Sequence, residues 1–270
     1  MLLRRQHQDI VFYTSPLLEQ ARIPHAFSTR VGGVSPAPFA SLNLGISRDS
    51  TLKDTSENVE ENYRRFATTL GPASRQRCWI SQVHQADICT IHPGDVFTSG
   101  PRADALMTDD PTRLLGIKYA DCVPILLATN DGKVVAAIHA GWRGIVAGIL
   151  PLAVQRMTQI SRSRPNTFIA AVGPCICLDH FEVGPEVSAE FIRHFGPSAP
   201  IRPANAEHPK DHIDLARAVA MQLTQAGLST GQINLANLCT FSNPEDFYSH
   251  RRDGAATGRM AALIAPSKTR

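Results

Sequence analysis

The chain has 270 residues, of which 43% are hydrophobic and 19% charged, so it can bury a sizeable core as one large domain or two small ones. Its net charge of +3 comes without a long run of Lys or Arg, which argues against a nucleic-acid groove and favours a small anionic ligand. No stretch approaches the roughly 18 consecutive apolar residues of a membrane helix, and no apolar segment of a signal peptide follows Arg4 and Arg5. We therefore expect a cytoplasmic protein with reduced cysteines and no membrane partner.

The first half of the chain is predicted to contain a long loop, a helix and several short strands. Residues 30–50 are rich in Gly, Pro and Ser, which is typical of an ordered loop, and long loops are usually functional. Apolar residues at helical spacing predict a helix near 54–70, which the Gly-Pro pair at 71–72 would end. Apolar runs predict strands at 78–83, 86–91, 104–108, 113–119, 123–129 and 133–138.

The second half is predicted to mix helices and strands. Helices are expected at about 143–160, 185–195 and 213–226, and strands at 167–172, 232–238 and 257–265. Hairpins outnumber regular βαβ units in this pattern. We therefore expect an α/β fold, one domain over 1–270, with mixed or largely antiparallel sheets and flanking helices.

An Asp-Gly pair at 131–132 lies between two apolar runs, which is a strong signal for a short β-hairpin. If this pair forms the turn, His139 lies opposite Pro124 on the neighbouring strand, and a four-residue loop keeps the same register. Cys122 then lies diagonal to His139 on the same face, with backbones roughly 7–8 Å apart. The hairpin therefore predicts a thiol and an imidazole together at one end of a sheet.

Thiolate and imidazole are both good zinc ligands, and a catalytic zinc typically has three protein ligands and one open position. The best candidate for the third ligand is His84, in the segment SQVH at the end of another apolar strand. We call His84, Cys122 and His139 the trio. Spacing alone leaves open that Cys122 is a small buried hydrophobe and His139 a buried histidine with satisfied hydrogen bonds. Asp121 could orient a ligating histidine, act as an acid or base, or accept backbone N–H groups in a turn.

Two arginine-bearing segments are candidate phosphate sites. In the turn GWRG, glycines leave free N–H groups at a helix start beside Arg143, which suits an anion, although a solvated Arg143 explains the pattern equally. Near the C-terminus, Arg251, Arg252 and Arg259 lie in a Gly-containing loop. They could clamp a phosphate or form a solvated charged loop.

Several familiar motifs are absent. Cys175 and Cys177 are one residue apart, which fits neither a thioredoxin motif nor a standard zinc knuckle. His139 is followed by Ala-Gly, so the zinc-deaminase signature is missing. His208 and His212 have i, i+4 spacing without the Glu of a zinc protease, and we expect them to be surface residues.

Segments along nearly the whole chain resemble the YfiH-type family, also called laccase-domain, polyphenol oxidoreductase or purine nucleoside phosphorylase proteins. The matching segments, in order, are FSTRVGGVS, SLNLG, SQVH, ADALMTDD, ADCVPILLA, AAIHAGWRG, GPCIC…FEVG and FYSHRRDGAATGRMAALI. QVH, ADCVP and HAGWRG together are highly specific. The chain departs from the family pattern at Gln85, Phe181 and His250, none of which belongs to the trio.

The resemblance implies an α/β fold similar to certain toxin deamidase domains and a catalytic zinc site at the trio. It implies phosphorolysis of adenosine, inosine and 5′-methylthioadenosine, together with adenosine deamination. Hydroxide formed at the zinc would attack C6 of adenosine. In phosphorolysis, phosphate held by arginines would attack C1′ as the purine leaves. Our phosphate-binding candidates are Arg30, Arg143 and Arg251, and the expected partners are a purine nucleoside and phosphate, with no nucleic acid.

Other functions remain open for the same residues. Two histidines and one cysteine also suit a copper site, so a copper-dependent polyphenol oxidase is an alternative, although the chain lacks the His-x-His pairs of multicopper laccases. A metal-free hydrolase would use Cys122 as nucleophile and His139 as base. A structural zinc would need a fourth ligand, for which Cys175 or Cys177 is the candidate.

Overall fold

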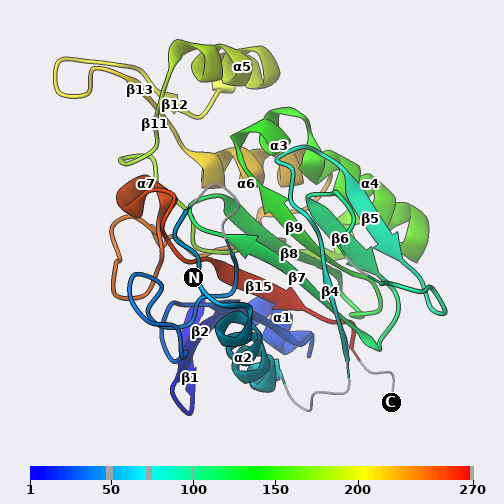
Figure 1. The fold of residues 1–270 in the computed structure, drawn as a ribbon. Coiled ribbons are helices and arrows are strands. Elements are labelled where there is room, and N and C mark those ends of the chain that lie inside the picture. Colours follow the sequence, from blue (N-terminus) through cyan, green and yellow to red (C-terminus); the bar gives the residue numbers. More distant parts are fainter. Residues whose placement is uncertain (47–50, 71–74, 99, 268–270) are drawn as a thin grey trace.

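The fold is built from sheets packed face to face, with helices on their outer faces (Figure 1). A computed structural model describes residues 1–46, 51–70, 75–98 and 100–267. The first sheet has the order β1 (Leu3–His7), β2 (Ile10–Thr14), β3 (His25–Ser28), β15 (Met260–Ile264), β7 (Arg113–Tyr119) and β4 (Gln76–Trp79). The second has the order β14 (Ile233–Leu235), β10 (Phe168–Val172), β8 (Val123–Thr129), β9 (Val135–Ala140), β6 (Ala105–Thr108) and β5 (Ile88–Ile91).

Both sheets are mixed. The pairs β4–β7, β5–β6 and β10–β14 are parallel, whereas neighbours such as β8–β9 and β15–β7 are antiparallel. The expected α/β fold with mixed sheets is therefore confirmed.

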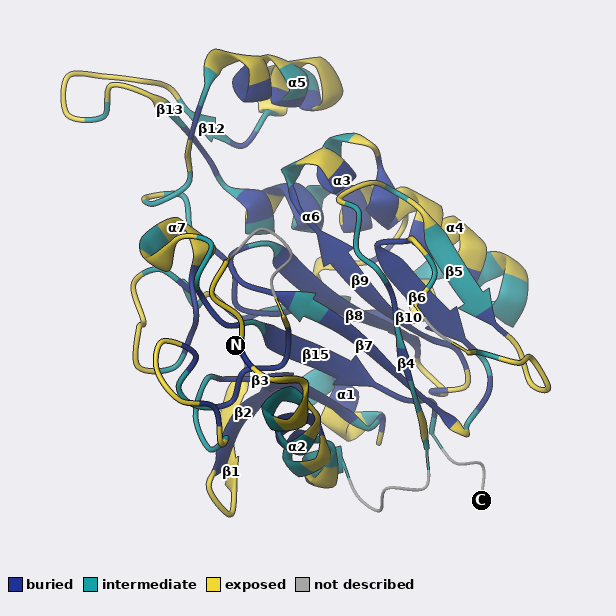
Figure 2. Cartoon of the chain, in the orientation of Figure 1, coloured by how far each residue is buried: buried dark blue, intermediate teal, exposed yellow. Residues whose placement is uncertain are grey.

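The central strands are buried on both faces, as their nearly continuous apolar sequences require. In β15, Met260, Ala262 and Ile264 pack between the two sheets, whereas Ala261 and Leu263 face the layer that contains α2 (Ser56–Ala67). Figure 2 shows these strands as a buried centre with exposed residues on the surrounding helices and loops.

Helices cover the outer face of the second sheet. These are α3 (Trp142–Val146), α4 (Ile149–Ser161) and α6 (Leu215–Gln225), which share a hydrophobic core with β8, β9 and β10. A small sheet of β11 (Glu182–Val183), β13 (Asp211–Ile213) and β12 (Ile201–Arg202) projects from the body together with α5 (Pro185–Phe195) (Figure 1). Over the described ranges, no helix has the length and apolar character needed to cross a membrane.

The hairpin of β8 and β9 has the predicted register. Thr129 N–H donates to Val134 O at 3.0 Å, which closes a four-residue loop over 130–133. His139 accordingly pairs with Pro124. This register places Cys122, just before β8, at the end of the sheet where His139 lies.

Other elements differ from the prediction. The expected helix at 143–160 is interrupted because Gly148 adopts the left-handed conformation, with φ of 77°, between α3 and α4. The strand expected at 78–83 is β4, which ends at Trp79, and Ile213 belongs to β13 rather than to α6. We did not predict β1, β2, α1 (Pro16–Gln20), β3 or the small sheet. The predicted helix stop at 71–72 and the last part of the loop at 30–50 lie outside the described residues.

Candidate metal and substrate site

The structure brings the trio together from three separate segments. His84 follows β4, Cys122 precedes β8 and His139 lies in β9. One ligand atom from each residue lies within 4.8 Å of the others. The imidazole rings of His84 and His139 meet edge to face at 4.9 Å between centroids. His139 is buried, Cys122 is partly buried and His84 is exposed, so the cluster is anchored inside the protein and open on one side.

Asp104 organises this cluster, and sequence reasoning assigned it no role. Its side chain is fully buried and accepts a hydrogen bond from His139 Nδ1 at 2.9 Å. It also accepts the backbone N–H groups of Val83, His84 and Gln85 at 3.2, 3.0 and 2.8 Å. These bonds hold His84 in its left-handed conformation, with φ of 60°. One carboxylate therefore orients His139 so that Nε2 faces the trio, and also fixes the loop that carries His84.

Gly141 leaves the space in which the trio meets. A Cβ atom at this position would lie 3.1 Å from Cys122 Sγ and 3.3 Å from His84 Cδ2. Its backbone angles, φ of −75° and ψ of 169°, are ordinary for any residue. A side chain here would therefore crowd the trio, so the advantage of glycine is room and not backbone freedom.

The electrostatics of the trio favour a thiolate beside an imidazolium in the metal-free protein. Burial alone would raise the pKa of Cys122, but attraction to His139 and hydrogen bonds with His139 and His84 lower it to about 6. Burial alone would lower the pKa of His139, but the charge of Cys122 and the hydrogen bond to Asp104 raise it to about 9. The thiolate form is the one that binds metals and attacks carbon.

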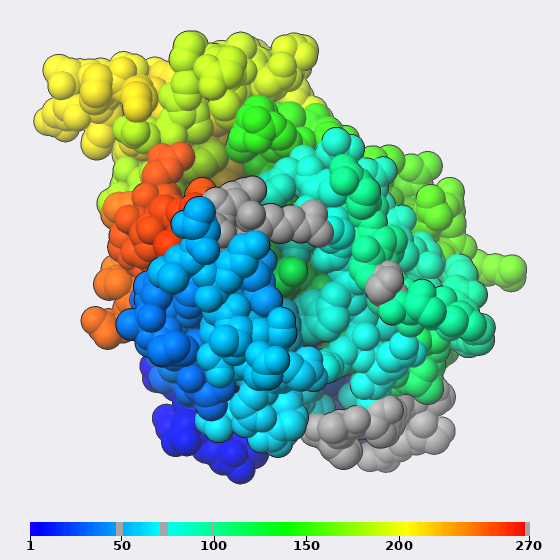
Figure 3. Space-filling model, viewed as in Figure 1, coloured from blue at the N-terminus to red at the C-terminus, as the bar shows by residue number. Residues whose placement is uncertain are grey.

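The trio lines a pocket of about 570 Å³, which is within the usual range for small-molecule sites. Figure 3 shows a hollow on one face of the protein, between segments coloured blue and cyan, with green atoms at its floor. Aromatic residues Trp142 and Phe181 contribute to the walls, and the cations are Lys118, Arg251 and Arg259. The pocket therefore joins the Cys–His cluster to flat apolar surfaces and positive charge.

The predicted phosphate-binding arginines are not gathered at one place. Arg251 lines the pocket, and its Nη1 donates to His180 O and Glu182 O, both at 3.1 Å. Arg30 donates to the backbone carbonyls of Ala40 and Pro244 and stacks on Tyr248, away from the pocket lining.

Arg143 is exposed and lies 4.3 Å from the ring centroid of its neighbour Trp142. It is not among the residues that line the pocket. The guanidinium group of Arg252 donates hydrogen bonds to the backbone carbonyls of Thr240, Phe241 and Phe247. Arg251 and Arg252 lie in the short helix α7 (His250–Asp253) and not in the predicted loop. Of the three C-terminal arginines, Arg251 and Arg259 line the pocket, whereas Arg252 does not.

Asp121 is a loop residue and not the partner of a histidine. Its carboxylate accepts the hydroxyl of Thr240 and the backbone N–H of Arg251, both at 2.6 Å. The histidine-orienting role that we considered for Asp121 belongs to Asp104. Among the described residues, neither Cys175 nor Cys177 joins the trio, so the fourth ligand that a structural zinc would need is not supplied by either candidate.

The donor set suits a transition metal. Two imidazoles and one thiolate can surround one ion, Asp104 fixes the tautomer of His139, and the bare Gly141 leaves the volume clear. Three protein ligands next to a pocket match the pattern of a catalytic site with an open position.

Known proteins resemble the chain over most of its length. Residues 24–267 match the family model described as multi-copper polyphenol oxidoreductase laccase. A protein named purine nucleoside phosphorylase from Deinococcus radiodurans is 40% identical over 243 residues, which cover 90% of this chain and 88% of that protein. Purine nucleoside phosphorylase YfiH of Escherichia coli is 36% identical over 88% of this chain and 91% of its own length.

The fold is also found in solved structures. The crystal structure of YlmD from Geobacillus stearothermophilus matches with a TM-score of 0.87 and 31% sequence identity, over 99% of this chain and 100% of that one. A hypothetical protein YfiH of Bacillus licheniformis matches with a TM-score of 0.85 and 27% identity, over 98% and 99% of the two chains. The chain therefore belongs to the YfiH-type family, whose family model is that of the polyphenol oxidoreductase laccases.

Proposed function

We propose that this protein is a purine nucleoside phosphorylase that works with a zinc ion held by the trio. The observation that carries the proposal is the meeting of His84, Cys122 and His139 within 4.8 Å at a pocket of about 570 Å³. The names of the relatives from Deinococcus radiodurans and Escherichia coli support the choice of substrate class. We expect adenosine, inosine and 5′-methylthioadenosine as substrates.

Zinc, when bound, would supply Lewis-acid chemistry, polarising a substrate oxygen or lowering the pKa of a water molecule. The chain's own contribution is orientation. Asp104 keeps one proton of His139 on Nδ1, so the proton lost on metal binding would come from Nε2, whose lone pair would then face the trio. The exposed His84 ring places the third donor on the pocket side.

The pocket residues explain how both substrates could be held. Trp142 and Phe181 offer flat surfaces against which a purine can stack, and Arg251 and Arg259 offer guanidinium groups for phosphate. In phosphorolysis, a phosphate oxygen forms a bond to C1′ while the bond from C1′ to the purine breaks, and the purine leaves with a proton. Because both phosphate and nucleoside would be bound in place, the reaction would occur between groups that are already positioned.

Substitutions can test which arginine binds phosphate. We expect Arg251→Ala to raise the KM for phosphate more than the KM for nucleoside, because its guanidinium lines the pocket. Arg143→Ala is the matched control, since Arg143 is exposed outside the lining, and it should leave the KM for phosphate unchanged. Equal effects of the two substitutions would remove Arg251 from the phosphate site.

We also propose adenosine deamination at the same site as a second activity, in which water replaces the amino group at C6 and ammonia leaves. We keep copper-dependent phenol oxidation as a second candidate function because the family description names it and the trio is a His–His–Cys set. The lowered pKa of Cys122, where attraction to His139 outweighs burial, also suits a metal-free thiol hydrolase. Such a hydrolase would be blocked by alkylation but not by chelators, whereas an oxidase would consume oxygen in proportion to bound copper.

A nucleoside panel, incubated with and without phosphate and read by chromatography, tests the proposal. We expect free base and ribose 1-phosphate only when phosphate is present, and ammonia from adenosine. Cys122→Ala should abolish turnover with the fold intact, whereas Cys89→Ala, in β5 outside the pocket, should not. Base release without phosphate, or full turnover by Cys122→Ala, would overturn the proposal.

A further inference from the structure

A second cluster of metal-binding side chains lies apart from the trio. One ligand atom each from Cys177, His180 and Cys239 lies within 4.8 Å of the others. Cys177 and His180 lie between β10 and β11, and Cys239 follows β14, so the cluster is assembled from two distant segments. We propose that Cys177, His180 and Cys239 form a second metal site, which binds zinc through two thiolates and one imidazole.

The backbone holds the two cysteine-bearing segments together without help from a metal. Cys175 N–H donates to Leu238 O at 3.2 Å, and Thr240 N–H donates to Cys175 O at 3.0 Å. Cys177 N–H donates to Cys239 Sγ at 3.3 Å. The thiols of Cys177 and Cys239 are therefore brought to one place by an ordered bridge, which lowers the entropic cost of assembling a site.

The imidazole of His180 is also positioned. A turn brings it back to Cys177, because the backbone N–H groups of His180 and Phe181 both donate to Cys177 O at 3.1 Å. The ring stacks on Phe241, with centroids 4.2 Å apart and planes at 26°. Cys-x-x-His spacing on a turn, with the ring held against an aromatic face, is suited to two ligands of one ion.

The chemistry of the donors selects the kind of metal. Two sulfurs and a nitrogen favour zinc and other thiophilic ions over magnesium or calcium, which prefer oxygen. Burial opposes ionisation of Cys239, but hydrogen bonds with Ser242 and Cys177 lower its pKa. Burial and the neighbouring Cys239 raise the pKa of Cys177 to about 11. Zinc binds the deprotonated form of both cysteines, so its binding would release thiol protons to solvent.

This second site adjoins the pocket wall without sharing a ligand with the trio. Ile176 and Phe181, next to the ligands Cys177 and His180, line the pocket. The carbonyl of His180 accepts a hydrogen bond from Arg251, which also lines it. An ion at the second site would therefore tie down the wall that carries Phe181 and Arg251.

Metal analysis of variants tests this proposal independently of the proposed function. Protein expressed with zinc and purified in reductant is compared as wild type, Cys122→Ser, Cys239→Ser, the double variant and the control Cys89→Ser. We expect Cys122→Ser to lose the zinc of the trio and Cys239→Ser to lose the zinc of the second cluster. The double variant should lose both ions, and Cys89→Ser should lose neither. Circular dichroism identifies any variant that fails to fold, and His180→Asn replaces Cys239→Ser in that case.

Cobalt substitution gives a second readout. In the Cys122→Ser background the trio is broken, so cobalt(II) added to the metal-free protein reports on the second cluster alone. We expect thiolate-to-cobalt absorption bands, which disappear when Cys239→Ser is added. Absence of bound zinc and of these bands in folded Cys122→Ser would overturn the proposal, as would a Cys177–Cys239 disulfide in protein isolated in the presence of reductant.

Discussion

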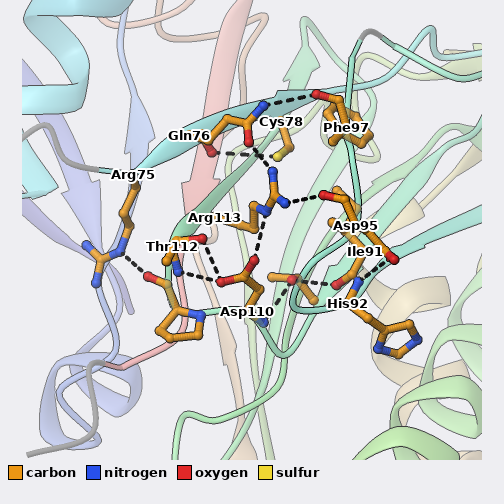
Figure 4. A network of polar contacts seen from close by, with 12 residues as sticks. Arg75, Gln76, Cys78, Ile91, His92, Asp95, Phe97, Asp110, Thr112 and Arg113 are labelled. Carbon is orange, nitrogen blue, oxygen red and sulfur yellow. Dashed lines mark hydrogen bonds and ion pairs between the residues drawn. The ribbon is translucent and has the colours of Figure 1, made fainter.

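The two ends of β7 carry buried charged groups that are used in opposite ways. At its start, Arg113 and Asp110 form a salt bridge of 2.9 Å in which each side chain is only 7% exposed (Figure 4). Beyond its other end lie Cys122 and the buried pair His139–Asp104. Both regions are buried and polar, yet only the second adjoins the large pocket.

The difference lies in how completely the groups satisfy one another. Arg113 donates to Asp110, to the backbone carbonyl of Asp95 at 2.5 Å and to the side chain of Gln76, while Thr112 donates twice to Asp110. Every nitrogen of that guanidinium has a protein partner, as Figure 4 shows. In the trio, Asp104 satisfies only one side of His139 and the other faces a thiol and a cavity. The network around Arg113, in which the polar groups bind one another, can stabilise the fold. The trio has groups that face the pocket and can bind a ligand.

Arg113→Ala should give the largest change in stability. It leaves the carboxylate of Asp110 buried without its cation, which typically costs about 3–5 kcal/mol. Urea unfolding measures the effect, and Arg193→Ala, at an exposed ion pair on α5, should stay within about 1 kcal/mol of wild type. Similar losses for the two variants would contradict the contrast between a buried network and the surface.

Asp104→Asn should act on metal binding rather than on the Arg113 network. It weakens the bond that orients His139, and changes of such supporting groups typically cost about 10–100-fold in metal affinity. Competition with a fluorescent zinc chelator measures it, in the Cys239→Ser background so that the trio alone is titrated. Folded Arg113→Ala protein should keep the wild-type affinity. An unchanged affinity in Asp104→Asn would show that this carboxylate does not support the trio.

Gly141→Ala should have a smaller effect, confined to the trio. The new methyl group would press on Cys122 Sγ and His84 Cδ2, while the backbone angles suit alanine. We expect weaker zinc binding with a change in unfolding free energy of less than about 1 kcal/mol. Zinc affinity equal to that of wild type would contradict the claim that a methyl group at this position crowds Cys122 and His84.

The smallest expected effect is the loss of unfolding free energy when acid protonates Asp110 in the Arg113 network. Burial would raise the pKa of Asp110, but hydrogen bonds from Thr112 and Arg113 lower it below its usual value. A carboxyl group with a lowered folded-state pKa stabilises above its unfolded pKa of about 3.9, and this stabilisation is lost as the pH falls through the folded value. Unfolding free energies between pH 6 and 3 should therefore fall less steeply in Asp110→Asn than in wild type. Parallel curves would contradict the assignment.

Local patterns predicted some of these features and missed others for a physical reason. The Asp-Gly turn between two apolar runs determines the β8–β9 register, so the closeness of Cys122 and His139 was predictable. Asp104 was missed because its bond to His139 depends on the pairing of β6 with β9, which lie far apart in sequence. An acidic residue directly before the apolar run of β6 was the available signal.

The second Cys–His cluster was missed for a related reason. Cys177 and His180 meet Cys239 only through a bridge between segments about 60 residues apart, which spacing rules cannot detect. Arg30 and Arg143 illustrate the converse limit. They were predicted to bind phosphate, but neither lines the pocket that contains the trio.

The most direct test of the central claim is a titration of zinc into metal-stripped Cys239→Ser protein, with phosphate-dependent release of purine measured at each step. We predict that purine release rises in proportion to zinc bound at the trio and that adding Cys122→Ala removes both the binding and the activity. Full phosphate-dependent turnover by the metal-stripped protein would contradict the account.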